Sequence, residues 1–256
     1  MRGLLAFILA FILTLCACTA LCERKQDVII LDNGPELAAL PLEGRKIGID
    51  PGHQARGNNE KEPIAPGSKE TKAKVATGTK GVSTGTPEHV RDLEIALTLK
   101  EILEALGADV LMTRETGDVD ISNIERAVMM NEWGADAVLR IHCDGATDRG
   151  VHGLGMYVRK TGAMAEESAY LARCLIAAMS ARSGAAQRGV YRRDTYTGLN
   201  WSTVPCVLVE CGYMSNPTED EQLAQPEYQL KLCLGMAEGL IRYFEAADAA
   251  AEAAEE

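Results

Sequence analysis

The body of the chain alternates short apolar runs with longer amphipathic segments. Runs of strand length lie at 46–50, 108–114, 136–142, 153–159 and 206–212, and helical periodicity extends over about 88–106, 122–134, 163–183 and 228–246. Strands separated by helices are typical of a mostly parallel sheet with helices on both faces. The pattern therefore predicts an α/β fold, a single domain with a central, mostly parallel, twisted sheet.

The segment from Ala55 to Pro87 interrupts this alternation. It is rich in Gly, Pro, Lys and Thr and has almost no large apolar residue, so we expect a long loop, and loops of this length are commonly functional. Five lysines give it a local positive excess: Lys61, Lys69, Lys72, Lys74 and Lys80. We expect the loop to border a substrate groove, and a solvated surface loop is the alternative.

The first 22 residues, "MRGLLAFILAFILTLCACTALC", have one Arg, an apolar run and then small residues. This pattern predicts a secretory signal, because the run is short for a membrane-spanning helix. The stretch "LCAC" resembles a lipoprotein cleavage box that would lipidate Cys18, whereas cleavage near Ala20 or an uncleaved anchor are the plainer alternatives. We expect a signal peptide or membrane anchor at 1–22, a linker at 23–44, the domain at 45–246 and an acidic disordered tail at 247–256.

Composition narrows the possible partners and the compartment. The 256 residues are 46% hydrophobic, which is enough for one sizeable core. The net charge of −11 makes nucleic acid an unsuitable partner. Five cysteines follow the leader, and an odd number cannot pair completely within one chain, so a dense disulfide framework is not indicated.

Four residues could carry chemistry because each lies at the end of a predicted element. His53 follows the first strand in "KIGIDPGHQ", Glu88 opens the first long helix, His142 ends "DAVLRIH", and Glu210 ends "VPCVLVE". The carboxyl ends of parallel strands meet at one edge of a sheet, where α/β proteins usually place their ligands. Two imidazoles and two carboxylates there could form a zinc site with three ligands and one catalytic carboxylate.

Each of these residues also has a simpler interpretation. A histidine at a strand end is often a hydrogen-bonded structural residue. Glu88 near a helix start is explained by a favourable interaction with the helix dipole. Glu210 is harder to explain structurally, because an unpaired carboxylate that closes an apolar run would be costly. We expect the other two histidines, His89 and His152, to be solvated or packing residues.

Several separated motifs resemble, in order and spacing, the zinc-dependent N-acetylmuramoyl-L-alanine amidases of the type-3 amidase family. The motifs are "IDPGHQ", "GVSTGTPEHVRDLEIALTLKEILEALGADVLMTRE", "ISNIERAVMMNEWGADAVLRIHCDG", "VHGLGMYV" and "VPCVLVECGYMSNPTEDEQL". The resemblance covers about 46–244 and is greatest to the sporulation-associated branch from Gram-positive bacteria. The chain departs from the common pattern at Cys143, Asp144 and Cys211, none of which is one of the four candidate residues.

The resemblance implies a phosphorylase/hydrolase-like fold with one zinc ion per chain, bound by His53, Glu88 and His142, and it gives Glu210 the role of catalytic carboxylate. The implied reaction cleaves the amide between N-acetylmuramic acid and the L-alanine of the stem peptide of peptidoglycan. The implied location is the outer face of the cytoplasmic membrane or the cell wall. Whether a protein activator is needed stays open.

Two other functions remain compatible with these motifs. One is another exported zinc peptidase that acts within the stem peptide, because ligands alone do not determine which amide is cleaved. The other is a catalytically inactive murein-binding regulator. The intact set of four candidate residues argues against the inactive protein.

Overall fold

The computed structural model describes residues 40–255, and residues 42–255 belong to one compact unit. The unit begins with Leu42, which is fully buried and donates its backbone N–H to the carbonyl of Leu106. The leader and most of the linker that we expect at 1–44 lie outside the described residues. None of the helices in 40–255 is both long and apolar enough to cross a membrane.

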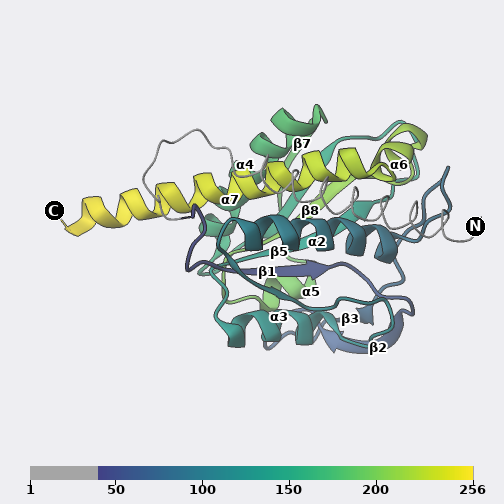
Figure 1. The fold of residues 1–256 in the computed structure, drawn as a ribbon. Coiled ribbons are helices and arrows are strands. Elements are labelled where there is room, and N and C mark those ends of the chain that lie inside the picture. The colour runs from purple at the N-terminus through teal and green to yellow at the C-terminus, as the bar shows by residue number, and fades with distance from the viewer. Residues whose placement is uncertain (1–39, 256) are drawn as a thin grey trace, which may run out of the picture. The chain divides into compact units, whose positions relative to one another are not determined.

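A six-stranded sheet forms the centre of the domain (Figure 1). The strands are parallel except for the antiparallel pair β6–β8. Their order is β4 (Asp109–Met112), β1 (Lys46–Pro51), β5 (Ala137–Asp144), β8 (Cys206–Tyr213), β6 (Leu154–Arg159) and β7 (Gln187–Arg193). Every residue of β8 is buried, which agrees with the near-continuous apolar runs expected of central strands covered on both faces.

Helices cover both faces of the sheet (Figure 1). On one face lie α2 (Glu88–Ala105), α4 (Ala165–Ser183) and α7 (Pro226–Glu255); on the other lie α3 (Asn123–Trp133) and the short α5 (Thr197–Trp201), and α6 (Pro217–Leu223) connects β8 to α7. The start of α3 has a capping box, in which Ser122 and Glu125 satisfy each other's backbone N–H groups. The arrangement of helices on both faces of the sheet matches the fold that the alternating pattern predicts.

Two local expectations are wrong, and one strand is not predicted. The segment 55–87 is not a plain loop, because it contains the antiparallel hairpin of β2 (Asn58–Pro63) and β3 (Thr71–Val75). The edge strand β7 has a polar sequence, QRGVYRR, which hides it from a search for apolar runs. The acidic segment from 247 is helical to Glu255 rather than disordered, since Ala and Glu are strong helix formers and Asp248 pairs with Arg45.

A buried ionic cluster lies under the end of β1. Asp50 accepts hydrogen bonds from Thr113 (2.6 Å) and from Nη1 of Arg126 (2.8 Å), and its other oxygen lies 3.1 Å from Nε of Arg140. Burial alone would raise the pKa of Asp50, but Arg140 and Arg126 hold it well below its usual range. The carboxylate is therefore ionised and bound between two guanidinium groups.

The same Arg126 also fixes the turn that follows β1. Its Nη1 donates to the carbonyl of Pro51 (2.7 Å) and its Nη2 to the carbonyl of His53 (2.8 Å). Arg114 adds bonds to the carbonyls of Pro51 and Gly52, at 3.0 and 2.6 Å. The turn thus leaves the sheet with its carbonyl groups satisfied by buried arginine side chains.

We predict that Arg126→Met destabilises the metal-free protein by about 3–5 kcal/mol, because it leaves Asp50 and the turn carbonyls buried without their donor. The measurement is the free energy of unfolding in urea. Arg182→Met is the matched control: Arg182 pairs with Glu238 at the surface, so about 1 kcal/mol or less should be lost. Equal stability losses in the two variants would contradict this account of the turn.

Candidate metal centre

His53 lies in the turn after β1 with an unusual backbone conformation. Its φ of 55° makes it the one non-glycine residue with positive φ among residues 40–255. Such a conformation costs about 1–3 kcal/mol and persists where the surroundings enforce it, here through the bond from Arg126 to the His53 carbonyl. On the imidazole, Nδ1 lies 2.7 Å from the carbonyl oxygen of Ala76, to which it can only donate. This bond leaves the lone pair of Nε2 available.

Glu88 is the first residue of α2, directly after Pro87. Its Oε2 accepts the backbone N–H of Thr79 at 2.7 Å. Its Oε1 lies 3.1 Å from Nε2 of His53 and 3.1 Å from Nδ1 of His142. One carboxylate oxygen and two ring nitrogens therefore converge on a common point.

Two glycines allow this close approach. A Cβ atom on Gly52 would lie 2.3 Å from Cε1 of His142, inside the ring's van der Waals radius. A Cβ on Gly78, which has a φ of 84°, would lie 2.8 Å from Oε2 of Glu88 and 2.9 Å from the His53 ring. The backbone at both positions thus packs directly against the three candidate ligands.

The protonation states suit cation binding. Burial lowers the pKa of His142 to about 4, so this imidazole is neutral at physiological pH. Burial opposes ionisation of Glu88, but the ring nitrogens of His142 and His53, each 3.1 Å from its Oε1, hold its pKa well below the usual range. Two imidazoles and one carboxylate form a donor set that zinc commonly accepts. The side chains are 7–15% exposed, so the cluster can be reached from solvent.

Glu210 lies beside this cluster on the neighbouring strand, paired in register with His142. It is 6% exposed, and its Oε2 has no hydrogen-bond partner within 40–255. Burial, followed by the charges of Asp144 and Glu88, raises its pKa well above the usual value. The structure thus brings all four sequence-predicted residues to one edge of the sheet, with Glu210 adjacent to the three that converge.

Asp92 is a further residue at the site that the motifs did not single out. It is fully buried on α2, and a group of possible metal ligands within 4.8 Å of one another comprises Asp92 together with His53, Glu88 and His142. The available signal was its spacing, since residues four apart lie on the same face of a helix. Burial and the neighbouring Glu88 raise its pKa well above the usual value.

Other candidate groups contribute little at this point. His152 is exposed, and His89, whose pKa is lowered by burial and by Arg114, is not part of the converging group. The thiols of Cys143 and Cys211 are fully buried with raised pKa values, so both are uncharged at neutral pH. A buried thiol of this kind behaves as a small hydrophobic group.

The segment 55–87 contacts the site through the residues that follow β3. Ala76 and Thr79 make the bonds to His53 and Glu88, and Gly78 lies between them. Two of its lysines are used within the protein, because Lys72 donates to the carbonyl of Thr195 and Lys74 pairs with Glu60. A direct contact between the other lysines and a substrate stays a prediction.

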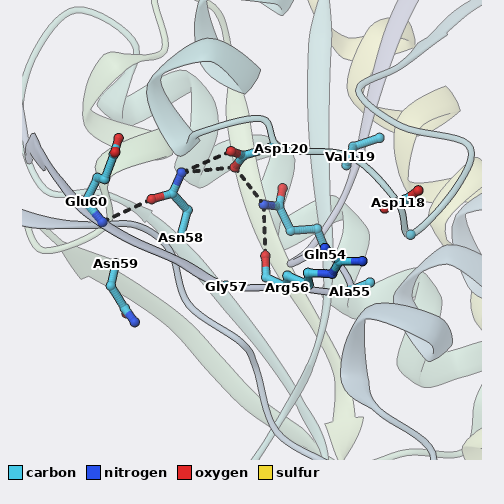
Figure 2. Close-up of a pocket in the computed structure, with 11 residues that line it drawn as sticks. Gln54, Ala55, Arg56, Gly57, Asn58, Asn59, Glu60, Asp118, Val119 and Asp120 are labelled. Carbon is cyan, nitrogen blue, oxygen red and sulfur yellow. Dashed lines mark hydrogen bonds between the residues drawn. The ribbon is translucent and has the colours of Figure 1, made fainter.

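A pocket of about 620 Å³ adjoins the His53 turn and is lined by 54–60 and 117–120. Figure 2 shows that Gln54 and Asn58 both point toward Asp120, and their amide nitrogens donate to its carboxylate at 3.0–3.2 Å. These bonds join the segment after His53 to the loop before α3. None of the converging residues lines this pocket, so it neighbours the candidate metal centre without containing it.

Comparison with known proteins gives a consistent assignment. The family model described as N-acetylmuramoyl-L-alanine amidase matches residues 47–242. A protein named "Probable cell wall amidase LytH" from Staphylococcus saprophyticus is 30% identical over 206 residues, which are 80% of this chain and 60% of that protein. An N-acetylmuramoyl-L-alanine amidase of Mycobacterium tuberculosis is 30% identical over 213 residues, covering 78% of this chain and 86% of that one. The chain thus spans about three fifths of the length of the staphylococcal relatives.

Solved structures share the fold. The crystal structure of the N-acetylmuramyl-L-alanine amidase Ami1 from Mycobacterium smegmatis superposes with a TM-score of 0.74 and 27% identity, covering 80% of this chain and 99% of that one. The crystal structure of the apo form of Ami1 from Mycobacterium abscessus gives a TM-score of 0.73 and 28% identity, with 79% of this chain and 100% of that one covered. The sheet and its flanking helices therefore have close experimental counterparts.

We predict that His142→Ala loses bound zinc, because one imidazole and one carboxylate hold the ion far less tightly than the full donor set. Metal analysis after dialysis should give about one zinc per chain for the unaltered protein and little for the variant. His152→Ala is the control and should retain the metal, since the exposed His152 ring makes a local hydrogen bond to the carbonyl of Gly150. Undiminished zinc in His142→Ala would remove this residue from the site.

Proposed function

The chain belongs to the N-acetylmuramoyl-L-alanine amidase family, and on this premise we propose that it is an exported, zinc-dependent amidase that acts on peptidoglycan. The observation that carries the proposal is the convergence of His53 and His142 on one oxygen of Glu88, beside the buried carboxylate of Glu210. The bond to be cleaved joins the lactyl carbonyl of N-acetylmuramic acid to the amine of L-alanine, the first residue of the stem peptide.

The donor set fits a single zinc ion. His53 and His142 would bind it through Nε2 and Nδ1, the two nitrogens that face Glu88, and Glu88 would supply Oε1. A zinc ion held by three protein ligands supplies Lewis-acid chemistry that polarises a carbonyl and acidifies water. The bond from His53 to Ala76 and that from Thr79 to Glu88 keep two of these ligands oriented before any substrate arrives.

Glu210 is suited to move the proton. Its carboxylate is buried next to the ligands, and Oε2 has no partner within the described residues, so it can accept a proton from an attacking water. It can then return this proton to the departing amine of L-alanine, which must be protonated to leave. Proton transfer by a positioned side chain typically contributes about 10²–10⁴-fold in rate. The buried surroundings also exclude bulk water from the carboxylate.

The location of the protein follows from its substrate. Peptidoglycan lies outside the cytoplasmic membrane, and the apolar leader at 1–22 provides an export signal. We propose that the domain acts at the outer face of the membrane or in the wall, held there by the leader or a lipidated Cys18, or released by cleavage. A role in sporulation stays a prediction from the motifs.

The identity of the cleaved bond is tested by mass analysis of purified peptidoglycan after digestion. The proposal predicts free stem peptides that begin with L-alanine, together with intact glycan chains. Peptide fragments cut within the stem would instead identify a peptidase. No released product from a zinc-loaded protein that binds peptidoglycan would identify an inactive regulator.

We predict that Glu210→Gln retains zinc but loses about a hundredfold or more in kcat, because the amide keeps the shape of the side chain and cannot accept the proton. Release of stem peptides from peptidoglycan is the measurement. Glu221→Gln, which alters an exposed carboxylate on α6, should turn over like the unaltered protein. Wild-type turnover in Glu210→Gln would leave this residue a structural strand-end group.

A further inference from the structure

Two buried side chains at the candidate metal centre have polar atoms without hydrogen-bond partners among residues 40–255. Both carboxylate oxygens of Asp92 lack a hydrogen-bond partner among residues 40–255, and so does Nε2 of His142. Asp92 is 0% exposed, and one of its oxygens lies within 4.8 Å of one possible ligand atom on each of His53, Glu88 and His142. A carboxylate without a partner in such a place is costly unless another state of the site satisfies it.

Arg114 does not satisfy Asp92. Arg114 is close enough to lower the pKa of this carboxylate somewhat, against the larger effect of burial. Its guanidinium, however, donates to the carbonyls of Pro51, Gly52, His89 and Thr116. These hydrogen bonds to backbone carbonyls use the N–H groups of Arg114. The carboxylate oxygens of Asp92 therefore receive no hydrogen bond from Arg114.

The two histidines differ in how their second nitrogen is used. His53 turns Nε2 toward Glu88 and gives its Nδ1–H to Ala76. His142 turns Nδ1 toward Glu88, and its Nε2 has no partner within the described part of the chain. Metal-bound histidines almost always donate their other N–H to a carboxylate, carbonyl or water, which fixes the ring and raises its basicity. His142 lacks the partner that His53 has.

We propose that Asp92 is the positioning residue of the metal centre, accepting the Nε2–H of His142 when Nδ1 of that ring binds the metal. Asp92 would do for His142 what the Ala76 carbonyl does for His53. This inference rests on the ligand set of the proposed function. Binding the metal directly is less suitable for Asp92, because a second carboxylate would fill the position that catalytic zinc sites leave for water.

Asp92→Leu is the informative variant, because leucine has a similar volume and no acceptor. Zinc affinity, measured by competition with a chelator, should fall about 10–100-fold, as is typical when the outer partner of a ligand is lost. The metal-free variant should be at least as stable as the unaltered protein, since a buried, unpaired carboxylate has been removed. Asp92→Asn, whose side-chain oxygen can still accept the N–H, should recover most of the affinity.

A second readout reports on His142 directly. Proton NMR of the zinc-loaded protein should show slowly exchanging imidazole N–H signals for both ligand histidines. Asp92→Leu should shift or remove the His142 signal and leave the His53 signal unchanged. Glu101→Leu, an exposed carboxylate on the same helix, is the matched control and should alter neither the signals nor the affinity.

The outcomes separate this inference from the proposed function. Zinc affinity and His142 signal that are unchanged in Asp92→Leu would overturn the positioning role, while His142→Ala still loses the metal. Loss of zinc in Asp92→Leu as complete as in His142→Ala would also overturn it, because Asp92 would then be a ligand. Retention of zinc by His142→Ala would instead refute the ligand set itself.

Discussion

The candidate site depends on the hydrogen bonds that the guanidinium of Arg126 makes. The chain leaves β1 at Pro51 and must place the imidazole of His53 over the edge of the sheet within two residues. Arg126 is bound by the Asp50 carboxylate and by the carbonyls of Pro51 and His53, and this holds His53 at a φ of 55°. A buried ion pair contributes little net stability by itself. Its effect here is on conformation. It holds the turn in one backbone conformation that the intrinsic preferences of the turn residues would not select.

That conformation of the turn brings together the ends of three elements that are distant in sequence. The turn after β1, the first residue of α2 and the end of β5 supply one candidate ligand each, and Gly52 and Gly78 leave room for the rings and the carboxylate. Because each group is oriented by a bond to the backbone or by close packing, the geometry exists before the metal or substrate binds. Such preorganisation is what makes the interactions of an active site effective in the transition state.

The sequence predicts well whatever depends on apolar periodicity. The central strands, the long helices and the α/β fold are confirmed, as is the resemblance to the amidase family, since the motifs lie at the ends of those elements. Apolar periodicity does not predict the polar edge strand β7 or the hairpin in 55–87, because their stability comes from strand pairing rather than from burial of side chains. The roles of Asp92 and Arg126 are not predicted for another reason. A charged residue in an amphipathic helix is expected to face solvent until its packing partners are known. The ligand and catalytic roles of the four motif residues stay predictions.

Two imidazoles and one carboxylate are proposed to hold a zinc ion at the edge of this sheet. X-ray absorption at the zinc edge of the loaded protein reports on these ligands. We expect light-atom ligands at about 2.0–2.2 Å, with the multiple-scattering signature of two imidazole rings. A sulfur shell near about 2.3 Å would contradict this ligand set, because the zinc would then be bound by a cysteine such as Cys143 or Cys211 instead of the set around Glu88.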